Sequence, residues 1–394
     1  MVCSANPSPR RPSLELADIV RAHGEACRRS YALTSDQTAV LRDIVRCRTA
    51  ALGGHLDVCD RCERTSPSYN SCRNRHCPKC QGLAQAKWIA AREERILPVR
   101  HFHAVFTLPA ELRTLVRFRR ESLFGMLFAC ASQTLLELGR EERHLGAQLG
   151  LTAVLHTWTR ELLFHPHVHC IVTGGGLAPS GRRWVDSRKK FLFPVKVMGA
   201  LFRGKFLDGL RKAYARGVFT GFHAFDDPQG FDRLMRALAT KDWVVYAKRA
   251  FGGAKQVYRY LGRYTHRVGI ANSRLVALRD DAVTFRTKNG KTLTLAPTEF
   301  LRRFLLHVLP AGFVKMRHFG LLAPGNVNTK LAQARALLEA RATHATSTEP
   351  SGRDILDALS GDKARRCPLC RVGLLHRRPL PPNWTPTVAS LDSS

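Results

Sequence analysis

Apolar positions along this chain switch repeatedly between the spacing of a helix and that of a strand. Over Leu14–Thr49, and again over Leu83–Ile96, they recur at intervals of three and four residues, which predicts helices. His101–Leu108 is rich in β-branched and aromatic residues and ends at Pro109, which predicts a strand. The residues around 47–80 are instead rich in cysteine and histidine.

Strands and helices continue to alternate through the middle of the chain. Helical spacing over Ala110–Leu138 precedes two predicted strands, Leu151–Thr159 and His165–Thr173, that meet at a short turn. Further along, the pattern predicts a strand at Phe191–Val197, helices at Lys205–Gly217, Lys255–His266 and Pro297–Leu309, and a hairpin of Arg274–Phe285 and Thr292–Leu295 around Asn289–Gly290. This order predicts an α+β fold with a mainly antiparallel sheet.

Composition divides the chain into four parts. Residues 1–13 are rich in Pro and Ser and are expected to form a flexible arm, and residues 14–97 a helical, metal-binding domain. Residues 98–330 would form the α+β domain. Residues 331–394 would be a helix and a flexible basic tail, because Thr, Ser, Pro and charged residues dominate beyond Ala340.

The net charge of the chain indicates which class of molecule it binds. Lys and Arg number 63 against 31 acidic residues, which gives a formal charge of +32. Such a charge attracts polyanions, of which nucleic acid is the commonest, and phosphate binding releases counterions. A ribosomal or membrane-surface protein would also be basic.

Neither a secretory signal nor a membrane span is expected from the sequence. Met1–Ile19 contains three prolines and several charges, and no run of about 18 apolar residues occurs. We therefore expect a cytosolic protein, in which the twelve cysteines are more often metal ligands than disulfides.

The cysteines predict a structural zinc site. Cys59-x-x-Cys62 and Cys77-x-x-Cys80 are fourteen residues apart, close to the spacing of a four-cysteine zinc ribbon. Four interleaved residues, Cys47, His55, Cys72 and His76, could hold a second zinc ion or could be small core residues and hydrogen-bond donors around the first. The late pair Cys367 and Cys370 is half a site, which would need partners elsewhere, or a solvated loop.

The segment HPHVHCIV predicts a second kind of metal site. On a strand, His167 and His169 point to one face and can bind one ion, and His165 falls on the same face. A divalent ion there would polarise a phosphoryl oxygen, but it needs a nucleophile nearby.

Two tyrosines in YLGRY are the candidate nucleophiles. Tyr260 and Tyr264 share one face of a helix, although such a pair more often packs in a core. A phenol with a pKa of about 10 is a poor nucleophile at neutral pH. Neighbouring cations, Arg259, Arg263 and Arg267 among them, would favour the phenolate and a bound phosphate.

Taken in order, these motifs resemble the rolling-circle, two-tyrosine HUH transposases of the insertion sequence ninety-one family. The likeness covers roughly residues 15–330. Its carriers are NSCRNRHCPKCQ (70–81), FTLP (106–109), HPHVHCIVTGGGL (165–177), YLGRYTHRV (260–268) and RRFLLHVLPAGF (302–313).

The resemblance implies a bacterial, nucleoid-associated DNA transposase whose HUH domain has helices flanking its sheet. His167 and His169 would hold Mg²⁺ or Mn²⁺, with His103, His165 or His266 as a third ligand. Tyr260 would attack one strand, leaving a 5′-phosphotyrosine, and Tyr264 would serve the second step. The zinc domain would recognise transposon ends, taken as single-stranded or locally melted DNA, which Arg259, Arg263 and Arg267 would contact.

Three alternatives stay open on sequence grounds. A plasmid replication initiator or relaxase would use the same chemistry at an origin. A zinc-ribbon DNA-binding protein could carry a decayed catalytic set. The histidine-triad nucleotide hydrolases match over seven residues, but they leave the zinc ribbon, the charge and the tyrosines unexplained.

Overall fold

A six-stranded antiparallel sheet forms the centre of the protein. The computed structural model describes residues 14–80, 82–188, 192–249, 262, 269–340 and 366–384. The strands lie in the order β11-β4-β5-β3-β7, with β6 paired to β5. Their bounds are β3 His101–Thr107, β4 Gln148–Trp158, β5 Phe164–Leu177, β6 Trp184–Asp186, β7 Val245–Arg249 and β11 Met316–Gly320. The α+β class and the antiparallel sheet predicted from the sequence are confirmed.

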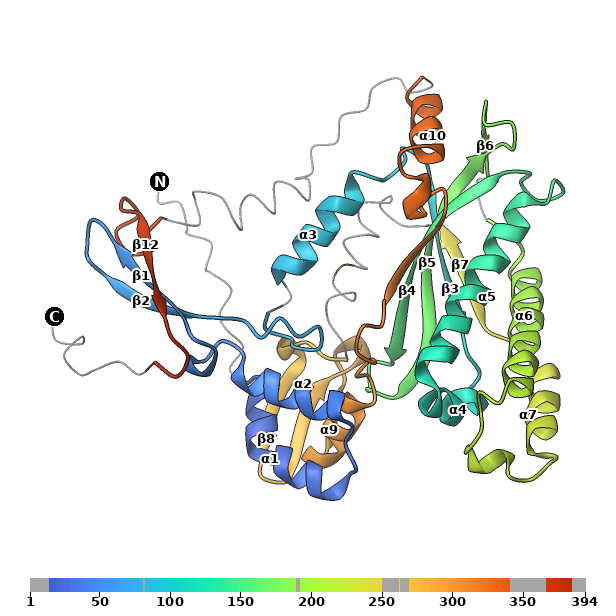
Figure 1. Cartoon of the computed structure of the whole chain (residues 1–394). Helices are drawn as coiled ribbons and strands as arrows, with labels where there is room; N and C mark the ends of the chain where they lie inside the picture. The colour runs from blue at the N-terminus through green and yellow to red at the C-terminus, as the bar shows by residue number, and fades with distance from the viewer. Residues whose placement is uncertain are drawn as a thin grey trace.

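One face of this sheet packs into the main hydrophobic core. Side chains alternate along β5, so Val168, Cys170 and Val172 point together into this core, where they are fully buried. Two helices of 21 residues, α5 (Arg120–Arg140) and α6 (Val195–Ala215), cover this face, as Figure 1 shows.

The opposite face carries the histidines and is covered by α3 (Gly82–Glu93). Trp88 and Ile89 of this helix pack against Val154 and Ile171 of the sheet. In Figure 1, α3 lies on the side of the sheet away from α5 and α6. The two faces differ in chemistry because successive side chains of a strand point to opposite faces: on β5, apolar side chains point to one face and the histidines to the other.

A second core joins segments far apart in the chain. It is built from α1 (Leu16–Ser30), α2 (Ser35–Arg46), α9 (Pro297–Leu305) and a small sheet of β8 (Leu275–Arg279), β9 (Ala282–Arg286) and β10 (Thr292–Leu295). Residues expected in the helical domain thus share a core with residues expected in the α+β domain.

A third unit is a sheet in the order β12-β1-β2, formed by Leu375–Leu380, Gly54–Cys59 and Thr65–Tyr69. Residues 366–384 belong to the segment that composition predicted to be a flexible tail, and here the prediction is wrong. Pairing with β1 satisfies backbone hydrogen bonds of β12 within this segment.

The remaining elements complete the layers. They are α4 (Arg113–Phe118), α7 (Gly230–Ala239), α10 (Lys330–Glu339) and the short 3-10 turns at Ala50–Leu52, Ala110–Leu112, His223–Phe225, Asn272–Arg274, Lys288–Gly290 and Pro324–Asn326. Of the helices described, α5 alone is long and apolar enough to cross a membrane, and it lies mostly buried in the main core.

Two predicted strands differ from the structure. In the segment predicted as a strand at Phe191–Val197, the described residues 192–197 form no strand: Val195 begins α6, with Pro194 at its N-cap position, and Leu192 and Phe193 are buried before it. The segment Arg274–Phe285 divides into β8 and β9 at a tight turn. The predicted arm 1–13, and the predicted helix Lys255–His266 apart from Gly262, lie outside the described residues.

Candidate functional site

Three histidines converge on the face of the sheet that α3 covers. His167 and His169 come from β5 and His156 from β4, where His156 stands directly opposite His167. Each offers a ring nitrogen, and these three atoms lie within 4.8 Å of one another. Neighbouring antiparallel strands place facing side chains close enough for this.

Hydrogen bonds orient the two histidines of β5. The Nδ1–H of His167 donates to the carbonyl oxygen of His165 at 2.6 Å. Nδ1 of His169 lies 2.8 Å from Nε2 of His103, and the two rings stack with centroids 5.0 Å apart. Each Nδ1 is therefore engaged, which leaves Nε2 of both rings to face a metal ion.

Burial keeps these histidines neutral. It lowers the pKa of His167 to about 4 and the pKa of both His156 and His169 well below the ordinary value. A metal ion binds the neutral imidazole, so no proton has to be displaced at neutral pH. Three neutral and converging imidazoles, one buried (His156) and two half-buried (His167 and His169), fit a divalent transition-metal ion.

The rim of the group is aromatic and cationic. The Trp158 ring stacks on His156 with centroids 4.8 Å apart, and Nζ of Lys315 lies 4.7 Å from the centre of that indole. Burial lowers the pKa of Lys315 to about 7. Two other tryptophans, Trp88 and Trp243, are buried in cores and cannot stack on a bound base.

The third member of the group was missed from sequence. Neither His103 nor His165 belongs to it: His103 bonds to His169, and Nδ1 of His165 lies 3.5 Å from the Arg113 guanidinium. His266 lies outside the described residues. The available signal for His156 was a single histidine in an apolar strand expected to pair with the HPHVH strand.

The tyrosine motif is described only at its centre. Tyr260, Tyr264, Arg259, Arg263 and Arg267 lie outside the described residues. Gly262, midway between the tyrosines, is buried against α3: a Cβ placed on it would come within 2.7 Å of Cγ1 and Cδ1 of Ile89. Ile89 in turn packs on the histidine face of the sheet.

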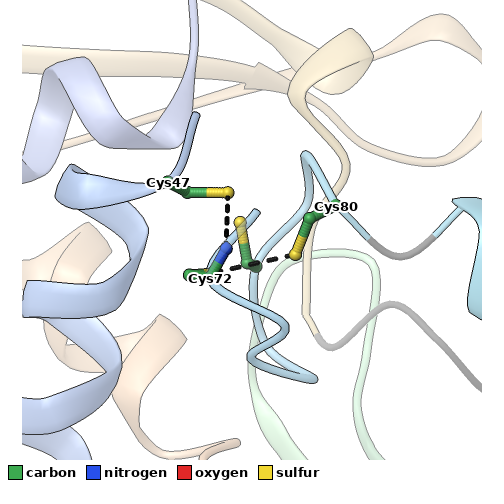
Figure 2. A group of neighbouring side chains, drawn as sticks. Cys47, Cys72 and Cys80 are labelled. Carbon is green, nitrogen blue, oxygen red and sulfur yellow. Dashed lines mark hydrogen bonds between the residues drawn. The ribbon is translucent and has the colours of Figure 1, made fainter. Parts of the chain in front are cut away.

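Four cysteines form a first sulfur group beside α2. Cys47, Cys72, Cys77 and Cys80 have their Sγ atoms within 4.8 Å of one another, and Figure 2 shows three of them close together. The Sγ atoms of Cys72 and Cys80 are 3.7 Å apart. Two thiolates on a tetrahedral zinc ion, with bonds of about 2.3 Å, are separated by about 3.8 Å, so this group fits zinc.

A second group of four cysteines consists of Cys59, Cys62, Cys367 and Cys370. The structure thus divides the cysteines differently from the predicted set of Cys59, Cys62, Cys77 and Cys80. His55 and His76 belong to neither group. Nε2 of His55 lies 3.6 Å from Asp57, whereas Nε2 of His76 accepts the Leu309 N–H at 3.1 Å.

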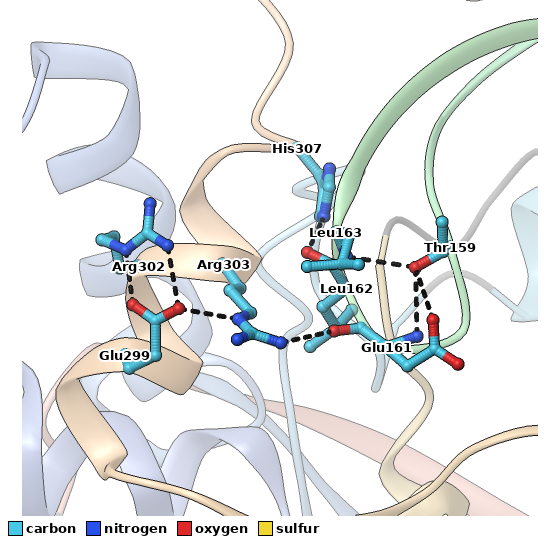
Figure 3. Close-up of polar contacts among 8 residues, drawn as sticks. All are labelled: Thr159, Glu161, Leu162, Leu163, Glu299, Arg302, Arg303 and His307. Atoms are coloured by element: carbon cyan, nitrogen blue, oxygen red, sulfur yellow. Dashed lines mark hydrogen bonds and ion pairs between the residues drawn. The ribbon is translucent and has the colours of Figure 1, made fainter. Parts of the chain in front are cut away.

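The cysteine-rich loop is docked onto residues 302–313, one of the motifs noted in the sequence. The Arg75 guanidinium donates to the Phe313 carbonyl at 2.5 Å, beside the His76 contact. Figure 3 shows the other side of this segment, where Arg303 and His307 donate to the carbonyl oxygens of Glu161 and Leu162. The motif therefore bridges the cysteine loop and the turn between β4 and β5.

Comparison with known protein families gives two matches. The model of the family described as transposase zinc-binding domain matches residues 19–108, which contain the first sulfur group. The model of the family described as putative transposase matches residues 150–330, which contain the three histidines.

Two curated relatives extend these matches. A putative transposase of Sinorhizobium fredii is 43% identical over 375 residues, covering 92% of this chain and 94% of the relative. The transposase for insertion sequence element IS801 of Pseudomonas savastanoi pv. phaseolicola is 27% identical, covering 71% of this chain and 68% of the relative. No solved structure matches the chain significantly.

Proposed function

Since the chain belongs to the insertion sequence ninety-one family of transposases, we propose that it cuts and rejoins single-stranded DNA at transposon ends through a tyrosine, in rolling-circle transposition. The family establishes a DNA-binding, DNA-cutting enzyme with a zinc-binding domain. The observation that carries the finer proposal is the convergence of His156, His167 and His169.

These three histidines would hold the catalytic ion. When bound, a divalent ion supplies a positive charge that polarises a phosphoryl oxygen. Mg²⁺ prefers oxygen ligands, whereas imidazole suits transition metals. Of the two ions that the family resemblance implies, Mg²⁺ and Mn²⁺, the set of three imidazoles therefore favours Mn²⁺.

Tyr260 and Tyr264 are the proposed nucleophiles. In the first step, the phenol oxygen of Tyr260 forms a bond to phosphorus and the bond from phosphorus to the 3′-oxygen breaks. The phenol loses a proton and the departing 3′-oxygen gains one. The energy of the broken bond stays in the 5′-phosphotyrosine, so rejoining needs no ATP.

Contact between the tyrosine segment and α3 supports this assignment. Gly262 lies two positions from each tyrosine, and it packs on Ile89. The same isoleucine contacts Val154 and Ile171, which flank the histidines on β4 and β5. Gly262, the one described residue of the motif, is therefore connected through Ile89 to the face of the sheet on which the ion would lie.

Lys315 would help to hold the scissile phosphate. Its ammonium group is buried beside Trp158, and its charge lowers the pKa of His156 and His169 after the larger effect of burial. The negative charge of a bound phosphate would favour the protonated form of this lysine. The first sulfur group would hold the zinc ion of the domain that recognises the transposon ends.

The test is a covalent adduct on labelled single-stranded DNA from the ends of the element. Purified protein, DNA and Mn²⁺ should give a protein–DNA band on a denaturing gel. The band should disappear in Tyr260→Phe/Tyr264→Phe and in His167→Ala, because these changes remove the nucleophiles and a metal ligand.

Tyr214→Phe is the matched control, since Tyr214 stacks on Phe231 at 3.9 Å within the helical layer. It should keep the adduct. DNA binding without any adduct would support a non-catalytic binder and refute the proposal. An adduct on plasmid-origin DNA and none on transposon ends would point instead to a replication initiator or relaxase.

A further inference from the structure

Two Cys-x-x-Cys pairs from opposite ends of the chain meet at the end of β1. Cys62 and Cys367 are 305 positions apart in sequence, yet their Sγ atoms are 3.7 Å apart. The Sγ atoms of Cys59 and Cys370, separated by 311 positions, are also 3.7 Å apart. All four sulfurs lie within 4.8 Å of one another.

These distances fit shared coordination of an ion. Sulfur atoms in a disulfide are about 2.05 Å apart, well below the observed separations. Two thiolates on tetrahedral zinc are about 3.8 Å apart, given zinc–sulfur bonds of about 2.3 Å. Four cysteines also complete the tetrahedron, which is typical of a closed structural site.

The backbone makes similar turns at both pairs. Glu63 and Arg371, each directly after the second cysteine of a pair, have φ values of 55° and 60°, which non-glycine residues uncommonly adopt. The Cys62 N–H donates to Sγ of Cys59 at 3.5 Å, and the Gly373 N–H donates to Sγ of Cys370 at 3.3 Å. N–H donors directed at sulfur favour the thiolate, the form that binds metal.

Gly373 allows the two pairs to approach each other. A Cβ at this position would lie 2.5 Å from Sγ of Cys59 and 2.7 Å from Oδ1 of Asp60. That same carboxylate oxygen accepts the Leu374 N–H at 2.8 Å. The backbone after Cys370 is therefore fitted against the Cys59 turn.

The contact continues as a strand pairing away from the sulfurs. From Cys59 opposite Leu375 to Gly54 opposite Leu380, β1 and β12 pair without a register shift. Arg377 forms an ion pair with Asp57 at 3.1 Å. A ladder at the edge of so small a sheet is marginal alone, so a covalent or metal link at its end would decide its stability.

We propose that Cys59, Cys62, Cys367 and Cys370 form a second structural zinc site, which fastens the C-terminal segment 366–384 to the N-terminal domain. Half of this site lies beyond the residues matched by either family model, which end at 108 and 330. The site does not rest on the tyrosine chemistry proposed above. It makes β12 part of the β1–β2 unit and leaves the histidine face unchanged.

Metal analysis of the full-length protein tests the site. The wild-type chain should contain two zinc ions, one for each four-cysteine group. Cys367→Ser/Cys370→Ser should contain one, while Cys130→Ala, a buried cysteine outside both groups, should still contain two. Two ions in the double serine variant, or one in the wild type, would overturn the proposal.

Thiol alkylation with mass spectrometry locates the lost ion. In Cys367→Ser/Cys370→Ser, Cys59 and Cys62 should become reactive while Cys47 and Cys77 stay protected. Continued protection of Cys59 and Cys62 would refute the site. If the serine variant does not fold, Cys370→His tests the site instead, because an imidazole can replace a thiolate as a zinc ligand. Two zinc ions in this variant would support the site, and one zinc ion in the folded variant would overturn it.

Discussion

Two of the three histidines of the candidate metal site are oriented by hydrogen bonds to neighbouring residues. His167 donates to the His165 carbonyl, and His169 bonds to His103, so both rings present Nε2. Partners of this kind are worth about 10–100-fold in metal affinity in known sites. Loss of a ligand itself should cost at least as much.

His156→Ala should therefore weaken Mn²⁺ binding by about 100-fold or more, because it removes one of three ligands. Calorimetric titration of the purified protein measures this. His165→Ala is the matched control: it lies on the same strand face but outside the group, and it should leave the affinity nearly unchanged. Equal losses in the two variants would exclude His156 as a ligand.

A buried histidine outside the metal group predicts a pH effect on stability. His307 accepts from the Thr157 hydroxyl at Nδ1 and donates to Leu162 from Nε2, and burial lowers its pKa to about 3. The unfolded chain takes up this proton near pH 6.5 and the folded chain does not. The stability present above about pH 6.5 is thus lost progressively as the pH falls toward 3.

Urea unfolding at several pH values should show this loss, at up to about 1.4 kcal/mol per pH unit for His307. In His307→Gln the free energy of unfolding should fall less steeply between pH 6.5 and 5, whatever its absolute value. His223→Gln, at a fully solvated side chain, should keep the wild-type slope. Parallel curves for all three proteins would contradict the assignment.

At the scale of elements, α3 links the tyrosine motif to the sheet. Its Trp88 and Ile89 lie on Val154 and Ile171, and Arg92 donates to Nε2 of His318 on β11 at 3.1 Å. Gly262 approaches this helix so closely that no Cβ fits without movement of Ile89. If Tyr260 and Tyr264 act as proposed, this contact would help to set their distance from the metal ion.

Gly262→Ala should reduce adduct formation by about tenfold or more, because a small displacement of a nucleophile is costly. Ile89→Ala in the same chain should restore part of the loss, since it removes both atoms that the new Cβ would meet. Rates of adduct formation in the two single variants and the double variant test this. Strict additivity would show that the contact does not position the tyrosines.

At the scale of the whole molecule, segments far apart in the chain come together in the second core and in the pairing of β1 with β12. The second core combines α1 and α2 with α9 and the β8–β10 sheet. Leu16 N–H, at the start of α1, donates to the Asn272 side chain at 3.1 Å. Neither part of this core can bury its apolar side chains without the other.

A fragment of residues 14–97 should consequently be largely unfolded even with zinc present, because α1 and α2 would expose the face that α9 covers. Far-UV circular dichroism and NMR dispersion of the fragment measure this, with the full chain as reference. Adding residues 269–313 in trans should increase its helicity. A folded, cooperatively unfolding fragment would contradict the shared core.

Local structure could be predicted from the sequence. Spacing predicted most helices and strands, the hairpin at Asn289–Gly290, and His167 and His169 on one face of a strand. These features depend on neighbours a few residues apart, whose geometry is set by backbone periodicity. The motifs that led to the transposase assignment are likewise short runs of neighbouring residues, which can be read directly from the sequence.

Which local pieces meet was decided only by the tertiary structure. A Cys-x-x-Cys turn aims two sulfurs at one ion, but spacing does not specify the second turn; pairing of β1 with β12 brings in Cys367 and Cys370. Likewise, the register of β4 against β5 sets His156 opposite His167. Sequence thus determined the chemistry each segment carries, and long-range strand pairing determined which candidate ligands lie together.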